Sequence, residues 1–298
     1  MCGISGIIDD NLNSSLKILK ILEKYVGSKG YYQYSITHNV DEETARKGFG
    51  TGFMWMNKEG EIDYIKRNTL IEDLKVPIKK RCKAFIFFVG HTRWPSRGAP
   101  IGEARFTHPF VDCSKNVFVV HNGGFANYKE EYRKLKLKGH RFESEYRDLV
   151  VDSELIPHLI EEQLRDMKIN CRSVVASIRY VLEKIVELSV DGKPGNFVVL
   201  IRKFPYLILA QERMTSGSRF KVWKKNGKLL FSTYKDIKEA EEGLKILPDL
   251  NIEQLVEMNK KLDEIMAKLG YTPIRILKPG EIVLISEDRE IKTYRVKH

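Results

Sequence analysis

The cysteine that follows the initiator methionine is the first residue whose position suggests chemistry. The chain begins MCGISGII, and a methionine before a small residue is normally removed, which leaves Cys2 with a free α-amine beside its thiol. An α-amine has a pKa near 8, so it can accept the proton of its own side chain, directly or through one water. Cys2 is therefore a candidate nucleophile with a built-in base. The alternative is a small buried apolar residue without a chemical role.

Polar side chains at the ends of two apolar runs are the next candidates. The segment GHTRWPSRGAP (90–100) delivers His91 and Arg93 to the end of an expected strand. The planar guanidinium of Arg93 suits a carboxylate held by two hydrogen bonds, although a structural salt bridge is an equal alternative. His108 follows in a loop, where a histidine is more often structural than catalytic.

A second apolar run ends in VVHNGGFANY (119–128). The Asn122 side-chain amide beside the Gly123 N–H can form a two-donor oxyanion hole of the kind that acyl transfer needs. The alternative is a plain Asn-Gly turn. Asp152, at the start of an expected helix, can cap that helix or pair with an ammonium group of a substrate.

We expect no metal site from the residues considered so far. Cys2, His91, His108 and His121 could converge on zinc, but no two of them form the short-spaced ligand pair that metal sites usually contain. No two cysteines of the chain have a CxxC spacing, so a zinc knuckle or a thioredoxin-type motif is disfavoured and reduced thiols are expected.

The hydrophobic periodicity predicts strands and helices that do not alternate strictly, which disfavours a Rossmann fold and favours antiparallel sheets covered by helices in a single domain, 1–298. Strands are expected at 3–8, 49–56, 61–67, 84–93, 116–122, 196–202, 206–211, 219–224, 229–233, 281–286 and 289–296. Helices are expected at 15–26, 127–138, 152–164, 171–188 and 236–269, the last broken near Pro248.

Five motifs in a fixed order resemble the class II (N-terminal nucleophile) glutamine amidotransferase domain, and the resemblance covers nearly the whole chain. They are MCGISGII, HTRWPSRGAP, THPF, VVHNGGFANY and VDSELI. The resemblance implies an α+β fold, a four-layer αββα sandwich of two antiparallel sheets (the Ntn-hydrolase fold). It also implies that Cys2 attacks the side-chain amide of glutamine and that Asn122 and Gly123 hold the oxyanion.

The resemblance further implies a substrate pocket and no cofactor. Arg93 would bind the α-carboxylate of glutamine and Asp152 its α-ammonium. Trp94 and Ser96 belong to a segment, 94–98, that would cover the bound glutamine, and His108 would lie on the substrate side.

The HTRW motif followed by Ser96 and Gly98 is similar to the glutaminase domain of glucosamine-6-phosphate synthase. The segment GHRFESE with the later VDSELI is similar to the free-standing glutaminase subunit of archaeal-type glutamate synthase. No segment of the sequence resembles an acceptor domain, so we expect a partner acceptor or synthase subunit that consumes the ammonia. One alternative is a free-standing amidohydrolase acting on another γ-glutamyl amide. Another is a non-catalytic binding protein on the same fold.

The charged residues are distributed as expected for a protein with a lysine-rich, solvent-exposed surface. The net charge is +11, but the lysines are spread along the chain and interleaved with glutamate, so nucleic-acid binding is disfavoured. The apolar runs are too short to span a bilayer and no signal peptide is apparent, so no membrane association and a cytoplasmic location are expected. The sequence is compatible with a homo-oligomer as well as with a monomer.

Overall fold

The computed structural model describes residues 2–8, 12–13, 16–20, 50–93, 101–189, 195–212, 218–235 and 252–296. Several sequence predictions fall wholly or partly outside these residues. They concern Trp94, Ser96, residues 15 and 21–26 of the helix expected at 15–26, residue 49 of the strand expected at 49–56, and residues 236–251 of the last helix.

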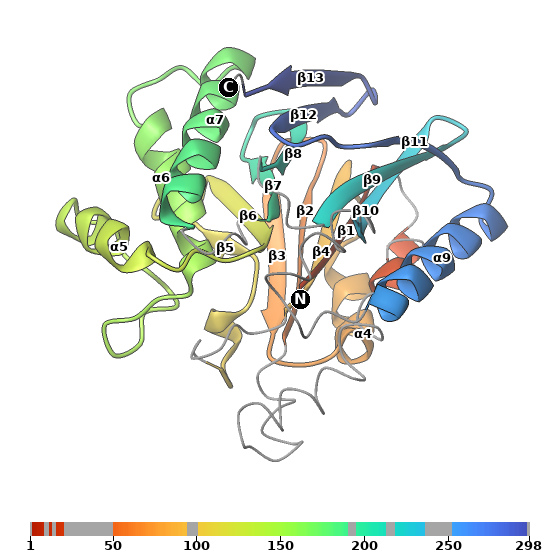
Figure 1. Ribbon diagram of the computed structural model, residues 1–298, viewed down its shortest axis with the longest axis horizontal. Coiled ribbons are helices and arrows are strands. Elements are labelled where there is room, and N and C mark those ends of the chain that lie inside the picture. The colour runs from red at the N-terminus through yellow and green to blue at the C-terminus, as the bar shows by residue number, and fades with distance from the viewer. Residues whose placement is uncertain are drawn as a thin grey trace.

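The first of two antiparallel sheets has seven strands, and the N-terminal strand lies in the middle of it (Figure 1). From one edge to the other its strands are β11 (Thr272–Ile276), β9 (Ser218–Lys225), β10 (Lys228–Lys235), β1 (Gly3–Ile8), β4 (Phe87–Arg93), β2 (Gly50–Met56) and β3 (Ile62–Arg67). Because β1 has hydrogen-bonded neighbours on both sides, the N-terminus is held in the sheet along its whole length.

The second sheet has six strands and is also antiparallel. From one edge to the other its strands are β13 (Ile291–Arg295), β12 (Glu281–Ser286), β8 (Tyr206–Gln211), β7 (Asn196–Ile201), β6 (Val117–Asn122) and β5 (Phe110–Val111). β6 contacts β1 across the space between the sheets, so two segments far apart in the sequence face each other there.

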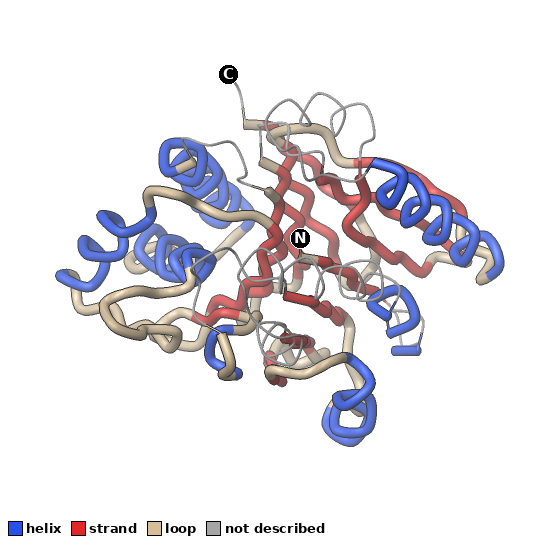
Figure 2. The backbone as a smooth tube through the Cα atoms, turned by 60° about the horizontal axis from the view of Figure 1, so that its bottom comes forward, coloured by secondary structure: helices blue, strands red, loops and turns tan. Residues whose placement is uncertain are grey.

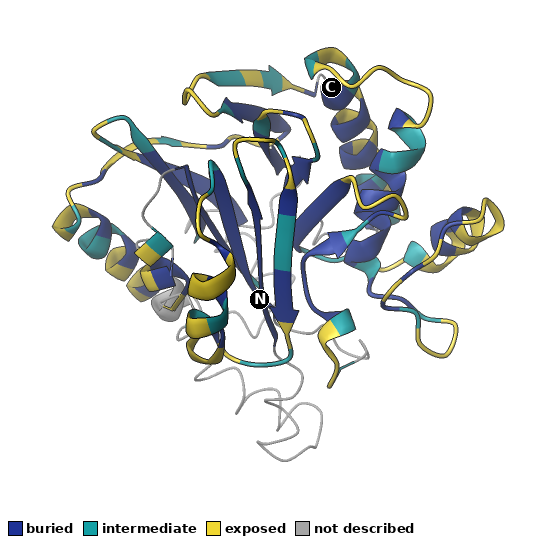
Figure 3. Cartoon of the chain, turned by 180° about the vertical axis from the view of Figure 1, so that it is seen from behind, coloured by how far each residue is buried: buried dark blue, intermediate teal, exposed yellow. Residues whose placement is uncertain are grey.

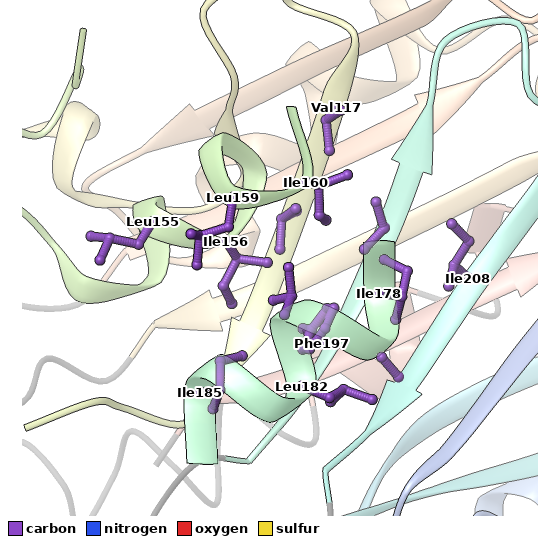
Figure 4. Packing of buried hydrophobic residues seen from close by; sticks show 14 of the residues in the cluster. Val117, Leu155, Ile156, Leu159, Ile160, Ile178, Leu182, Ile185, Phe197 and Ile208 are labelled. Atoms are coloured by element: carbon purple, nitrogen blue, oxygen red, sulfur yellow. The ribbon is translucent and has the colours of Figure 1, made fainter. Parts of the chain in front are cut away.

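Helices cover the outer face of each sheet, with α6 and α7 on the opposite side of the molecule from α9 (Figures 1 and 2). The helices are α4 (Ile71–Arg81), α5 (Tyr128–Leu137), α6 (Leu155–Leu164), α7 (Cys171–Leu188) and α9 (Ile252–Lys268), with the short 3-10 turns η1 (Ala104–Phe106) and η2 (Asp152–Glu154). The outer core of the second sheet is formed by α6 and α7 packed on β6, β7 and β8 (Figure 4).

The strand residues alternate between two cores, as the period of two in a strand requires. On β4, Phe87 and Val89 lie in the core between the sheets, whereas Phe88 lies in the outer core with α4 and α9. The central strands of both sheets are buried on both faces, whereas the edge strands β3, β11 and β13 carry exposed or half-buried residues, as do the outer sides of the helices and the loops (Figure 3). The fold is therefore the α+β sandwich with layers α, β, β and α that the sequence predicted.

The sequence analysis did not predict helix α4, strand β11, the two-residue strand β5 or the 3-10 turn η1. Helix α4 buries Ile71, Leu74 and Ile78 at helical spacing, but its lysines and the internal Pro77 make the segment resemble a basic loop. Strand β11 is an edge strand of five residues that are mostly exposed, so its sequence lacks an apolar run. The strand expected at 84–93 begins at Phe87. In the described part of the chain, no helix combines the length and the apolar character needed to cross a membrane.

Candidate active site

The register of the central strands brings Cys2 and Arg93 together. Gly3 pairs with Thr92 and Ile4 pairs with His91 in the β1–β4 ladder. Continued by one residue, the same register sets Cys2 opposite Arg93, the last residue of β4. Cys2 is half-buried and Arg93 is buried.

Both side chains belong to the face that looks toward the second sheet. Ile4 lies in the core between the sheets, so Cys2, two residues earlier, belongs to the same face of β1. Phe87 and Val89 also lie in that core, so Arg93 belongs to the same face of β4. The thiol and the guanidinium therefore share one end of the space between the sheets.

Strand β6 contributes Asn122 to this end from the other sheet. Phe118 and Val120 lie in the core between the sheets, so Asn122, the next residue of that face, continues the row. Its side chain is buried, and its Nδ2 donates a hydrogen bond to Ser218 Oγ at 3.0 Å. The contact fixes the amide of the second sheet against the first residue of β9 in the first sheet.

Two further amides extend the polar row across the second sheet. Asn122 pairs with Asn196 on β7, and Asn196 pairs with Gln211 on β8. Asn196 Nδ2 lies 3.4 Å from Ser218 Oγ, and Gln211 Nε2 donates to the Ser218 carbonyl at 2.9 Å. The space between the sheets is thus apolar over most of its length and polar at the end where Cys2 lies.

Gly195 allows the chain to approach the end of β6 closely. Its φ is +79°, and a Cβ built there would lie 1.7 Å from the Asn122 carbonyl oxygen and 2.7 Å from the Gly123 Cα. Any side chain at this position must therefore push away the backbone that carries Asn122 and Gly123.

Replacing Gly195 by alanine is expected to displace Asn122 and Gly123 and lower kcat for the reaction proposed below about tenfold to hundredfold, because small misplacements of catalytic groups are costly. Gly139→Ala is the matched control, since Gly139 also has a positive φ (+93°) but no atom lies within 4 Å of the position that its Cβ would take. Both variants carry similar backbone strain. Equal kcat values for the two variants would contradict the positional role of Gly195.

Asp152 fastens the loop that follows Asn122. Its Oδ2 accepts a hydrogen bond from the Phe125 N–H at 2.7 Å, and its Oδ1 accepts one from the Ser153 N–H at 2.8 Å. His121 Nδ1 lies 2.9 Å from Ser153 Oγ, which adds a second link between the same two segments. The 3-10 turn η2, which begins at Asp152, therefore holds the Gly123–Gly124 backbone in place.

His91 on β4 links the two sheets next to the polar end, through a hydrogen bond to β6. Its Nε2–H donates to the His121 carbonyl at 2.9 Å, and its ring packs on that of His108 with the centroids 3.9 Å apart. Burial lowers the pKa of His91 to about 3, although the hydrogen bond to His121 acts in the opposite direction. Burial also holds the pKa of His108 well below its usual range. Both imidazoles are therefore neutral near pH 7. His91 serves as a hydrogen-bonding group, and His108 packs against it with no hydrogen-bond partner for either ring nitrogen among the described residues.

The structure brings together most of the described residues that the sequence singled out. Cys2, Arg93 and Asn122 meet at the polar end, Gly123 follows Asn122, and Asp152 holds the adjoining loop. His108 is buried against His91, whereas Trp94 and Ser96 lie outside the described residues. The sequence reasoning missed Asn196, Gln211 and Ser218, whose only sequence signal is a polar residue at the end of an apolar strand.

Comparison with known proteins gives relatives in sequence and in structure. A glutamine–fructose-6-phosphate aminotransferase (isomerizing) of Methanococcus maripaludis is 29% identical over 270 residues, which cover 89% of this chain and 38% of that protein. Proteins of the same name match over 165 residues in Sulfurisphaera tokodaii, at 32% identity, and in Thermotoga maritima, at 34% identity. These matches cover 55% of this chain and 24% and 22% of the relatives, so the chain spans well under half of their length.

Solved structures share the fold. The allosteric regulatory enzyme of purine biosynthesis aligns with a TM-score of 0.59, and the glutamine phosphoribosylpyrophosphate amidotransferase from B. subtilis aligns with 0.56. Each match is 17% identical and covers 99% of this chain and 49% of the other chain. No family model matches the chain. The sequence relatives and the shared fold support a class II glutamine amidotransferase domain of the N-terminal nucleophile type, and the chain carries a cysteine at the head of its central strand.

Proposed function

We propose that the chain hydrolyses the side-chain amide of glutamine and supplies the ammonia to a separate acceptor site. The observation that carries the proposal is the position of Cys2, at the head of β1 on the face shared with Arg93 and across from Asn122. A nucleophile, a carboxylate-binding cation and an amide donor at one polar end of an apolar sandwich suit a small, charged amide substrate.

The chemistry begins at the terminus created by removal of Met1. The α-amine of Cys2 takes the thiol proton while the sulfur adds to the amide carbon of glutamine. The Asn122 side-chain amide and the Gly123 N–H stabilise the negative oxygen of the tetrahedral intermediate. The C–N bond then breaks, the α-ammonium returns the proton to the leaving nitrogen, and ammonia departs from a γ-glutamyl thioester. Water adds to the thioester, with the α-amine again as the base, and glutamate is released.

Arg93 and Asp152 account for the two charges of the substrate's amino-acid head. The fork of Arg93 binds the α-carboxylate, and Asp152 binds the α-ammonium while its carboxylate also holds the Phe125 N–H. Trp94, Ser96 and His108 are proposed to complete the pocket on the substrate side. His91, whose neutral ring joins the sheets, fixes the strand that carries Arg93.

Arg93→Lys is expected to raise KM for glutamine at least about tenfold with a smaller change in kcat, because a point charge cannot replace the bidentate fork. Steady-state kinetics of glutamate release measure both constants. Arg67→Lys, an exposed arginine at the end of β3, serves as the control and should leave KM unchanged. A KM for Arg93→Lys within twofold of the wild-type value would contradict the carboxylate-binding role.

The molecule that receives the ammonia is proposed to bind at a site separate from the residues that bind glutamine. The relatives are named as aminotransferases of fructose 6-phosphate, which supports a sugar phosphate as the acceptor of the ammonia. A synthase of the glutamate synthase type is the other candidate. We propose that residues 1–298 form a single amidotransferase domain and that the acceptor site belongs to a partner subunit.

A second candidate activity is hydrolysis of another γ-glutamyl amide. The same Cys2, Arg93 and Asp152 would serve, because the γ-glutamyl head is unchanged and only the leaving group differs. This possibility shares the chemistry of the first and is separated from it by substrate choice alone.

An alkylating analogue of glutamine tests the proposed pocket. Tag-free protein from which Met1 has been removed is incubated with the analogue, and peptide mass spectrometry locates the label. Labelling of Cys2 that free glutamine suppresses supports the glutaminase. Labelling that a bulkier γ-glutamyl amide suppresses, but glutamine does not, would favour the second activity. An unlabelled Cys2 in correctly trimmed protein would contradict both.

A further inference from the structure

We propose that Cys113, His140, His158 and Glu161 bind one zinc ion at a structural site remote in sequence from the nucleophile. The four side chains each direct one ligand atom toward the others, and these atoms all lie within 4.8 Å of one another. Thiolate, imidazole and carboxylate are the ligand types that zinc prefers.

Three separate parts of the fold contribute the four residues. Cys113 lies in the turn between β5 and β6, and His140 lies in the loop after α5. His158 and Glu161 lie three residues apart on α6, so they occupy the same face of that helix. This short-spaced pair is the kind of sequence signal that metal sites usually contain.

Five of the six distances between the ligand atoms are close to the edges of a tetrahedron around one zinc ion, and the sixth, between Cys113 Sγ and the Glu161 oxygen, is at most 4.8 Å. Zinc–nitrogen bonds of about 2.0 Å and a zinc–sulfur bond of about 2.3 Å give edges of about 3.3–3.6 Å. Cys113 Sγ lies 3.7 Å from both His140 Nδ1 and His158 Nδ1, and these two nitrogens are 3.2 Å apart. Glu161 Oε2 lies 3.1 Å from His140 Nδ1 and 3.4 Å from His158 Nδ1.

A hydrogen bond on the far side of His140 turns its electron pair toward the common centre, whereas His158 Nε2 is buried without a hydrogen-bond partner among the described residues. His140 Nε2 lies 2.9 Å from a carboxylate oxygen of Glu162, so Nε2 carries a proton and the neutral ring presents the lone pair of Nδ1 to the cluster. Such a carboxylate–histidine pair is typical of zinc ligands. Because the lone pair of His140 Nδ1 faces the Glu161 carboxylate at 3.1 Å, the contact is favourable only with a metal ion or a proton between the two atoms.

Backbone donors fix the other two kinds of ligand. The Arg141 N–H donates to Cys113 Sγ at 3.2 Å, which stabilises a thiolate. Glu161 Oε1 accepts from the Ser114 N–H at 3.2 Å, which leaves Oε2 for the centre. Glu161 Oε2 also accepts a hydrogen bond from the Cys113 N–H at 3.3 Å, so both carboxylate oxygens are held in place.

Four protein ligands fill the tetrahedron, which is the pattern of a structural site rather than of a catalytic one with an open position. The ion would join the β5–β6 turn and the loop after α5 to helix α6. Helix α6 directly follows Asp152 and η2, so the zinc would strengthen the support of the loop behind Asn122. Cys113 is exposed, which gives the ion a path from solvent.

Metal analysis of the tag-free full chain tests the site without reference to glutamine hydrolysis. After chelation and reloading with Zn²⁺, wild-type protein is expected to hold about one zinc ion per chain and to unfold about 5 °C or more above the chelated form. Co²⁺ in place of zinc should give a thiolate-to-cobalt charge-transfer absorption. Cys113→Ser should lose this absorption and most of the bound metal, and the exposed position makes misfolding of this variant unexpected.

Cys171→Ser is the matched control, because Cys171 is a free cysteine at the start of α7 that is not one of the four ligands. It should keep both the metal and the charge-transfer absorption. His158→Gln should lose the metal while Cys113 remains. Wild-type protein that binds no zinc would overturn the proposal in favour of a proton shared within the cluster. Zinc or cobalt bound equally by Cys113→Ser would also overturn it.

Discussion

Replacing Cys2 by alanine is expected to reduce glutamine hydrolysis to background, a loss of at least about 10⁴-fold in kcat, because no other group can form the covalent intermediate. Glutamate release is the measurement. Binding of glutamine should persist, since the residues proposed to hold the amino-acid head, Arg93 and Asp152, are untouched. Isothermal titration with glutamine separates this loss of chemistry from a loss of binding.

The control for the Cys2 variant is Cys171→Ser, which removes another half-buried thiol and should retain the wild-type rate. Circular dichroism and the Tm verify that β1 still forms in Cys2→Ala. Turnover of this variant within tenfold of the wild-type rate would refute the assignment of Cys2 as the nucleophile.

Replacing Asn122 by alanine is expected to lower kcat about 10²–10³-fold with little change in KM, because the amide stabilises charge that develops only in the transition state. The side chain is buried and oriented by its hydrogen bond to Ser218 Oγ, so the donor is fixed before the reaction. The expected effect is therefore large for the removal of one hydrogen-bonding group.

Asn116→Ala is the matched control on the same segment, since Asn116 is exposed and directly precedes β6 at the end away from Cys2. It should leave kcat unchanged. A loss of tenfold or less for Asn122→Ala would contradict its role as an oxyanion donor. A loss expressed in KM alone would instead assign Asn122 to substrate binding.

Most strands and helices could be predicted from the sequence because their hydrophobic patterns are clear, whereas the four-layer sandwich followed from the family resemblance. The runs that became β1, β6, β7 and β12 are apolar and end at polar residues, and the amphipathic helix α7 shows its buried positions at helical spacing. Helix α4 was missed because only three of its eleven residues are buried, and β11 because an edge strand carries few apolar side chains.

The candidate site was predictable in part. Cys2, Arg93 and Asn122 could be recognised as candidate site residues from their residue types and from their positions at the ends of apolar runs. The partners Asn196, Gln211 and Ser218 do not, because each is placed by sheet register and by packing between the sheets, which no local pattern encodes. The sequence analysis did not identify the proposed zinc ligands for the same reason, since Cys113, His140 and the α6 pair come together only in the folded chain.

The most direct test of the central claim is a search for the thioester itself. Tag-free protein is mixed with glutamine and quenched in acid within the first turnover, and the N-terminal peptide is weighed by mass spectrometry. We predict that the peptide beginning at Cys2 gains the mass of one γ-glutamyl group, and that Cys2→Ala shows no gain. Glutamate release by wild-type protein with no acylated Cys2 at any quench time, or acylation of another residue, would contradict the account.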